Sequence, residues 1–185
     1  MAARPDGLPS PEDVVKLLIL LALIVAAAWF APAPLSHAER SIEVEASRDR
    51  VWTILSELSS ARLWDPQMRD LKLVSEVKTG EGTERVAQGP VVRTTEKVVE
   101  WVPFNRVAFD VVHEPRLTRF ETSRIVLTPS GASNTRVTWT IDYQMNAGYL
   151  GNLADRLLLG SAHQGRIDEG LTRLERYAET GDVVP

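Results

Sequence analysis

The strongest hydrophobic pattern in the chain lies near its C-terminal end. Between Tyr149 and Glu179, residues of one stripe recur at alternating spacings of three and four. Such spacing keeps side chains on one side of an α-helix, so we predict a long helix over this range. The stripe consists of Leu150, Leu153, Leu157, Gly160, Gln164, Ile167, Leu171, Leu174 and Ala178. Its two ends are apolar, but Gly160 and Gln164 interrupt its middle.

Three glycines stand inside this predicted helix, at Gly160, Gly165 and Gly170. Each destabilises a helix interior by about 1 kcal/mol relative to alanine, so some other feature offsets the cost. One interpretation is a kink or break near Gly160–Gly165, or close approach to a neighbouring backbone. The other is that the helix spans a cavity whose ligand lies against the small and polar middle. The pattern leaves both open.

A second apolar stretch, from Val14 to Ala31, contains a single charge, Lys16. A helix of this length rises about 27 Å, close to the thickness of the hydrocarbon layer of a bilayer. Trp29 stands where an interfacial aromatic residue is common, and Pro32 ends the helix. We therefore predict an N-terminal tail over residues 1–13, one transmembrane anchor over residues 14–31 and a linker over residues 32–39.

A cleaved signal peptide is the alternative for this segment. Ser36 and Ala38 place small residues at the two positions that a cleavage site requires. Against cleavage, the apolar run is longer than a usual signal core, and the residues before it are not distinctly basic. We favour a retained, single-pass anchor. The basic residues flanking it are nearly balanced; we place the short tail inside and the domain on the extracytoplasmic side.

The remaining domain, residues 40–180, begins with alternating polar and apolar residues over Ser41–Glu45, which predict a strand. Ser47 follows as a helix N-cap, and Asp65-Pro66 ends a second short helical turn. Apolar runs separated by turn residues then predict a meander of antiparallel strands. Its strands are expected at residues 71–77, 83–88, 91–101, 106–113, 117–127 and 136–144.

This order of elements predicts an α+β domain. A curved antiparallel sheet of about seven strands has one apolar face, and the terminal helix is the element long enough to cover it. A sheet that curves around a helix leaves an elongated hollow between the two. We expect the anchor to precede this domain as the one transmembrane helix.

Composition excludes several classes of site. The net charge of −4 and pI near 5.5 give no indication of nucleic-acid binding, and the absence of cysteine excludes disulfides and thiolate chemistry. No paired-histidine spacing or glycine-rich phosphate loop is present, so we predict no metal and no cofactor. His113 shares a strand face with Phe109 and Val111 and is a weak candidate for an acid or base. His163 has no stronger claim.

The aromatic residues are the best candidates for a binding site. We predict that several of them line an apolar chamber, together with Gly160 and Gln164 of the terminal helix. These aromatic candidates are Trp64, Trp101, Phe109, Phe120, Trp139 and Tyr143. The alternative is that they only fill the core.

Four phrases of the sequence carry a resemblance to a known superfamily: Ile42–Trp52, Leu63–Pro66, Pro129–Gly131 and Asn134–Trp139. The chain resembles the START-like helix-grip superfamily and within it the SRPBCC or polyketide cyclase/dehydrase-like proteins. That superfamily includes lipid and sterol carriers, quinone chaperones and aromatic polyketide cyclases. The resemblance implies binding or transport of an apolar small molecule (a lipid, quinone or polyketide-like compound). A cyclase/dehydrase-like enzyme and an interaction module with a filled core remain as alternatives.

Overall fold

The computed structural model describes residues 10–131 and 133–183, apart from the side chains of residues 158–160. Helical segments flank a run of strands along this part of the chain. In order the elements are α1 (Pro11–Phe30), β1 (Ser36–Val44), α2 (Arg48–Ser56), a 3₁₀ turn (Leu58–Ser60), α3 (Ala61–Trp64), β2 (Leu71–Leu73), β3 (Glu84–Gln88), β4 (Arg93–Val102), β5 (Arg106–Glu114), β6 (Thr118–Pro129), β7 (Thr135–Met145), α4 (Gly148–Ala154), a π-helical turn (Asp155–Leu159) and α5 (Gly160–Thr180).

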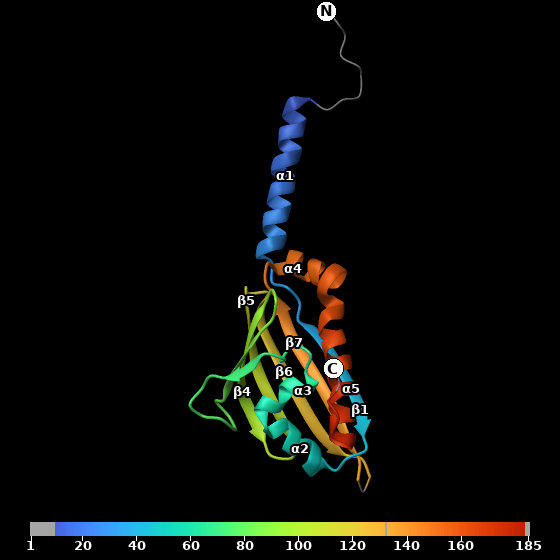
Figure 1. Cartoon of the computed structure of the whole chain (residues 1–185). Coiled ribbons are helices and arrows are strands. Elements are labelled where there is room, and N and C mark those ends of the chain that lie inside the picture. The colour runs from blue at the N-terminus through green and yellow to red at the C-terminus, as the bar shows by residue number, and fades with distance from the viewer. Residues whose placement is uncertain (1–9, 132, 184–185) are drawn as a thin grey trace, which may run out of the picture.

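The seven strands form one antiparallel sheet in the order β1-β7-β6-β5-β4-β3-β2. Each strand from β2 to β6 pairs with the next in sequence, and β1 pairs with β7 to form one edge of the sheet. The sheet curves around α5, with α2 and α3 covering the rest of its inner face (Figure 1). The predicted α+β architecture, with an antiparallel sheet around a long C-terminal helix, is confirmed.

The first strand begins earlier than the sequence pattern indicated. Ser36 pairs with Tyr143, and the pairing continues to Val44 opposite Thr135. Residues 36–39, which were expected in the linker, are therefore the start of β1. The reason is that Ala38 points into the core while His37 points outward, where its Nδ1 lies 2.7 Å from an Asp142 carboxylate oxygen.

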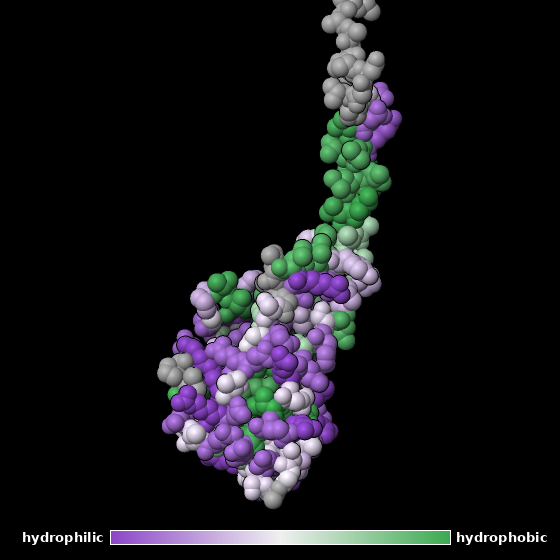
Figure 2. Space-filling view, turned by 90° about the vertical axis from the view of Figure 1, so that its right-hand side faces the viewer, coloured by the Kyte–Doolittle hydropathy of each residue, from purple (hydrophilic) through white to green (hydrophobic). Residues whose placement is uncertain are grey.

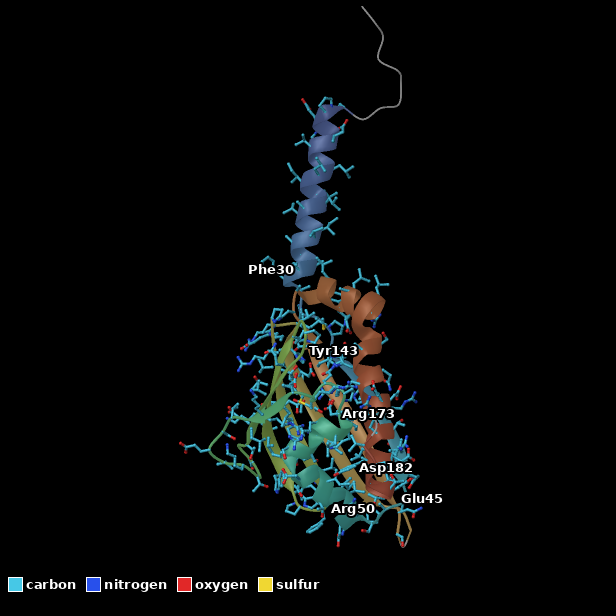
Figure 3. All side chains as sticks on the ribbon, in the orientation of Figure 1. Phe30, Glu45, Arg50, Tyr143, Arg173 and Asp182 are labelled. Carbon is cyan, nitrogen blue, oxygen red and sulfur yellow. The ribbon has the colours of Figure 1, made fainter. Side chains whose placement is uncertain are left out.

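The helix α1 projects from one end of the domain, and none of its residues is buried (Figure 3). Ser10 and Asp13 form a capping box at its N-terminus, where Pro11 occupies the first turn. Within the described residues it is the one helix long and apolar enough to cross a membrane. A signal sequence near the N-terminus satisfies the same criteria of length and composition.

The core lies between the inner face of the sheet and α5. Ile167, Leu171, Leu174 and Ala178 are all buried, as their predicted stripe requires. The helix packs against β1 and β7, and Trp139 of β7 is 1% exposed. The second half of the terminal helix thus covers the sheet as expected from the sequence.

The first part of the terminal helix departs from the prediction. The chain turns at Ala147 and Gly148, both with positive φ, and α4 then runs across the end of the domain next to α1 (Figure 1). A π-helical turn at Asp155–Leu159 joins α4 to α5. Leu153 and Leu157 are consequently 54% and 71% exposed instead of facing the core. The break falls just before Gly160, close to where the glycines indicated a kink.

Candidate functional site

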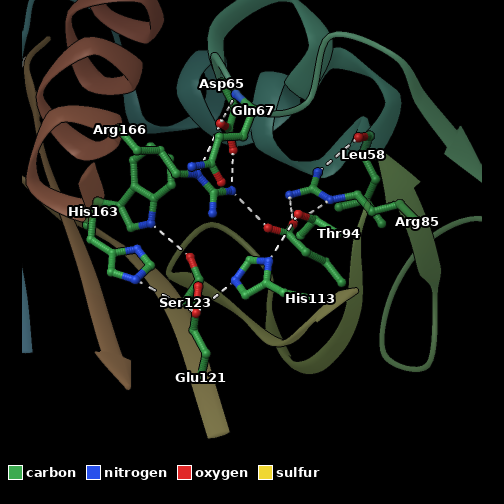
Figure 4. Close-up of polar contacts among 12 residues, drawn as sticks. Leu58, Asp65, Gln67, Arg85, Thr94, His113, Glu121, Ser123, His163 and Arg166 are labelled. Carbon is green, nitrogen blue, oxygen red and sulfur yellow. Dashed lines mark hydrogen bonds and ion pairs between the residues drawn. The ribbon is translucent and has the colours of Figure 1, made fainter. Parts of the chain in front are cut away.

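Arg166 of α5 lies at the centre of a buried ion-pair network, although arginines are rarely buried (Figure 4). Its Nε donates to Asp65 Oδ1 at 3.1 Å, and its Nη2 donates to Asp65 Oδ2 at 2.6 Å and Glu96 Oε1 at 2.8 Å. Arg85 donates to Glu96 Oε2 from both Nε and Nη2, at 2.9 and 2.6 Å. Two cations and two carboxylates thus neutralise each other inside the domain.

The charges of this network outweigh the effect of burial. Burial alone raises the pKa of Glu96, but Arg85 and Arg166 hold it at about 2. Burial alone lowers the pKa of Arg166, but the charges of Asp65 and Glu96 have the larger effect. The pKa of Arg166 therefore lies above its ordinary value. The four side chains join α5 to β3, β4 and the loop after α3.

A second polar cluster lies on the sheet beside this network. His113 Nε2 lies 2.9 Å from Glu121 Oε2, and its Nδ1 lies 3.2 Å from the hydroxyl of Thr94. His163 Nε2 approaches the same Glu121 oxygen at 3.9 Å from α5. Both ring nitrogens of His113 are therefore engaged.

Tyr143 and Asp155 extend this second polar cluster. The Tyr143 hydroxyl donates to Asp155 Oδ2 at 2.9 Å, and the tyrosine ring lies 4.3 Å from that of His163. Burial and the neighbouring carboxylate raise the pKa of Tyr143 to about 12. Burial lowers the pKa of His163, although the charge of Glu121 opposes the shift. His163 is accordingly a neutral imidazole at pH 7.

Three buried polar atoms of this cluster have no hydrogen-bond partner in the described structure. They are Glu121 Oε1, Asp155 Oδ1 and His163 Nδ1. Buried polar atoms are nearly always paired, and an unpaired one costs about 1–3 kcal/mol. Two carboxylate acceptors and one imidazole nitrogen thus remain available for hydrogen bonds.

A cavity of about 480 Å³ lies alongside the cluster, between the start of α5 and the loop that joins β3 to β4. This volume falls within the range of small-molecule sites. Its polar wall contains Thr94, His113, Thr118, Asp155 and His163. Its apolar wall contains Pro66, Pro90, Val91, Val92, Leu117, Met145 and Ala162, while Gln67, Arg69, Asp70, Gln88 and Gly89 complete the lining.

Most of the aromatic residues predicted for the site lie elsewhere in the core. Trp64 and Trp139 pack edge to face with ring centroids 5.6 Å apart, and Trp139 Nε1 donates to Ser123. The Arg85 guanidinium covers the ring of Phe109 at 4.3 Å. Tyr143 reaches the cluster through Asp155. None of these four aromatic residues lines the cavity, so their contact with a ligand stays a prediction.

The other predicted residues are also outside the cavity wall. Trp101 is half-buried against Trp52, and Phe120 is 42% exposed. Gln164 donates to Asp168 Oδ1 at 3.4 Å on the outer side of α5. The surroundings of Gly160 lie outside the described residues. Instead of Gln164, its neighbour His163 faces the cavity.

The cavity wall nevertheless includes His113, the one histidine singled out from the strand pattern. Thr94 and Asp155 were not among the residues predicted from the sequence, and His163 was no stronger a candidate than His113. Asp155 stands three residues after Asn152 on a short helical segment, and both are buried, a pattern that could have drawn attention to it. Within the described residues, no group of three or more His, Asp or Glu side chains is arranged to hold a metal ion.

An antiparallel sheet curved around a long C-terminal helix, with a cavity between them, defines a helix-grip protein. The family described as "Polyketide cyclase / dehydrase and lipid transport" matches residues 36–179. The chain belongs to this family.

Solved structures share the fold at low sequence identity. A Thermobifida fusca protein has a TM-score of 0.63 with 22% identity, covering 77% of this chain and 92% of that one. A Thermus thermophilus protein has a TM-score of 0.62 with 23% identity, covering 77% and 97%. Norcoclaurine synthase from Thalictrum flavum has a TM-score of 0.59 with 14% identity, covering 79% and 94%. No curated protein matches the chain in sequence.

Proposed function

We propose that this protein is anchored in a membrane by α1 and binds or carries an apolar small molecule in the cavity beside α5. The cavity is the observation that carries this proposal. Its apolar wall suits the body of a lipid, quinone or polyketide-like compound, and the polar wall suits a hydrogen-bonding end group. Burial of apolar ligand surface supplies about 25 cal/mol per Å² before the costs of association.

The polar wall favours a particular kind of end group. Asp155 has an unpaired carboxylate oxygen, and no ion pair joins it to a cation in the described structure. The neutral imidazole of His163 lies beside it with an unpaired Nδ1. A ligand with a hydroxyl or another hydrogen-bond donor as its end group fits this wall. A ligand that ends in a carboxylate or a phosphate is repelled by Asp155.

The first strand supports a retained anchor over a cleaved signal. Cleavage after Ala38 removes Ser36, His37 and Ala38, which pair with Tyr143, Asp142 and Ile141 at one edge of the sheet. It also removes a hydrogen bond from Asn152 of α4 to Ser36. We therefore propose a retained, single-pass anchor. We also propose that the domain lies on the extracytoplasmic side of the membrane, which protease digestion of intact and opened vesicles tests.

Binding has more support than a cyclase-type reaction. A general base must reach the proton that it removes, but both ring nitrogens of His113 are already hydrogen-bonded. The likeness to norcoclaurine synthase extends to the fold.

A titration of the full-length protein tests the proposal. Delipidated protein in detergent is titrated with a fluorescent long-chain alcohol, with the matching fatty acid and with a short-tailed quinone. We expect saturable binding of the alcohol or the quinone. Ala162→Trp fills the cavity and should weaken binding at least tenfold, while Ser161→Trp, at an exposed neighbouring position outside the lining, should not. Flat titrations with all three probes, or unchanged binding by Ala162→Trp, contradict the proposal.

A further inference from the structure

The segment formed by α4 and the π-helical turn has its apolar side outward. Tyr149, Leu153 and Leu157 follow one another at four-residue spacing and are 56%, 54% and 71% exposed. On the inner side, Asn152 and Asp155 are 6% and 3% exposed. An amphipathic helix on a water-exposed surface shows the opposite arrangement. The exposed ridge of this segment therefore suits an apolar surrounding.

Further apolar side chains are exposed at the same end of the domain. Figure 2 shows apolar patches next to the base of α1, and the face of α1 seen there is also apolar. We call this region the α1-proximal surface, and it comprises Phe30, Leu35, Leu117, Phe120, Tyr149, Leu153 and Leu157, each at least 39% exposed. Clustered apolar exposure of this kind marks an interaction site.

Close packing fixes this surface relative to α1. Gly148 lies so near the end of α1 that a Cβ atom there would stand 2.5 Å from the carbonyl oxygen of Trp29 and closer still to that of Ala31. Gln144 Nε2 also donates to the carbonyl of Ala33 at 2.6 Å. Because α4 runs across the end of α1, a bilayer spanned by α1 lies against α4 (Figure 1).

The charges around the α1-proximal surface complement anionic lipid. Arg116, Arg119 and Arg156 are exposed at this end, and the described part of the chain offers none of them an ion-pair partner. Arg119 borders a groove shared with Trp29 and Phe30 at the base of α1. Three basic side chains at one end contrast with the net charge of −4 for the whole chain. The negative surface potential of anionic lipid attracts basic side chains that lie next to a membrane-spanning helix.

We propose that the α1-proximal surface rests on the bilayer, with α4 and the π-helical turn lying in the interface and Arg116, Arg119 and Arg156 contacting anionic headgroups. The proposal rests on the anchoring role of α1 in the proposed function. Leu117 belongs to both the α1-proximal surface and the cavity wall. The bilayer contact thus adjoins the cavity, and an apolar ligand moves between the two without crossing bulk water.

Single-cysteine labelling in nanodiscs tests the contact, because the chain has no cysteine of its own. The variants Leu153→Cys and Leu157→Cys carry an environment-sensitive fluorophore, and some of the lipids carry a quencher. Phe30→Cys reports on the anchor, and Asn134→Cys reports on the exposed β6–β7 loop at the opposite end of the domain. We expect quenching at positions 153 and 157 to be severalfold stronger than at position 134 and comparable with that at position 30.

The controls separate the two proposals. Quenching at position 30, with positions 153 and 157 behaving like position 134, overturns the bilayer contact and leaves the anchor intact. Absence of quenching at position 30 overturns the anchor itself.

The basic residues are tested in the same system. Replacing Arg116, Arg119 and Arg156 by Gln in the Leu153→Cys protein should lower quenching in anionic nanodiscs to its value in zwitterionic ones. The matched changes Arg62→Gln, Lys72→Gln and Arg176→Gln, at exposed positions away from this surface, should leave it unchanged. Equal quenching by the two triple variants in anionic nanodiscs overturns the role of the three arginines.

Discussion

Arg166 and the carboxylates around it show how one residue joins distant parts of the chain. A lone buried guanidinium is strongly unfavourable, but Asp65 in the α3–β2 loop and Glu96 in β4 accept hydrogen bonds from its Nε and Nη2. Arg85 then satisfies the second oxygen of Glu96. The network is stable as a unit, and the loss of any one member leaves an uncompensated charge in the core.

Removing Arg166 should therefore destabilise the domain far more than removing a surface arginine. We expect Arg166→Met to lower the free energy of unfolding by about 3–5 kcal/mol, because Asp65 and Glu96 lose their cation. Arg40→Met removes an exposed ion pair with Asp168 and should cost no more than about 1 kcal/mol. Chemical denaturation in detergent measures both, and Glu96→Gln serves if Arg166→Met does not fold. Equal losses for buried and exposed pairs contradict this interpretation.

Protonation of His163 should lower the stability of the protein at a higher pH than protonation of Glu96 does. Its pKa is lower in the folded protein than the ordinary 6.5, so the unfolded chain binds the proton first and stability falls as pH falls below about 6.5. Glu96, with a pKa of about 2, contributes its loss only below its ordinary 4.5. The groups that face His163 are Glu121, His113, Asp155 and Arg166.

The variant His163→Gln isolates this effect. Between pH 7 and pH 5 it should lose less stability than the wild type, as measured by denaturant titration at each pH. Parallel losses over that interval would show that His163 is not held neutral in the folded protein.

At the scale of elements, α5 contains two glycines with opposite surroundings. A Cβ at Gly170 would lie 2.5 Å from Cζ3 of Trp139, which is almost completely buried. A Cβ at Gly165 meets nothing within 4 Å. Close approach of a tryptophan thus explains Gly170, and helix packing gives no reason for Gly165.

These surroundings predict opposite effects of alanine. Gly170→Ala should destabilise the protein by about 1–3 kcal/mol, since Trp139 has no room to move. Gly165→Ala should stabilise it by about 1 kcal/mol through helix propensity alone. Thermal unfolding of the two variants compares them directly, and a shift of the same sign in both would contradict the packing argument.

The spacing of apolar residues predicted the buried face correctly wherever a helix or strand is unbroken and packs on the core. The inward face of α5 from Ile167 to Ala178 and the alternation around Trp139 in β7 follow directly from the sequence. Leu153 and Leu157 did not follow the same pattern. A helical period relates residues within one helix, and the π-helical turn at Asp155–Leu159 separates α4 from α5 and gives each its own orientation.

The site was less predictable than the fold because its residues become a group only in three dimensions. Asp155, His163 and His113 come from a helix junction, α5 and β5, and no local spacing connects them. The aromatic residues were chosen by residue type, yet Trp64 and Trp139 pack against each other in the core. His113 was identified because strand alternation placed it on the inner face.

At the scale of the whole molecule, the proposed anchor and the cavity adjoin each other. The helix α1 ends against α4, the α1-proximal surface surrounds that junction, and the cavity wall shares Leu117 with it. The proposed anchoring would place the cavity beside the hydrocarbon layer in which apolar molecules concentrate. A protein with a filled core would lack this cavity.

Native mass spectrometry of the full-length protein, extracted gently with its bound molecules, shows whether the cavity holds an apolar ligand. We expect a discrete added mass at one copy per chain on the wild type and on Ser161→Trp, and its disappearance from Ala162→Trp. Wild-type protein that carries no such mass, and acquires none when apolar alcohols or quinones are supplied in excess, would contradict it.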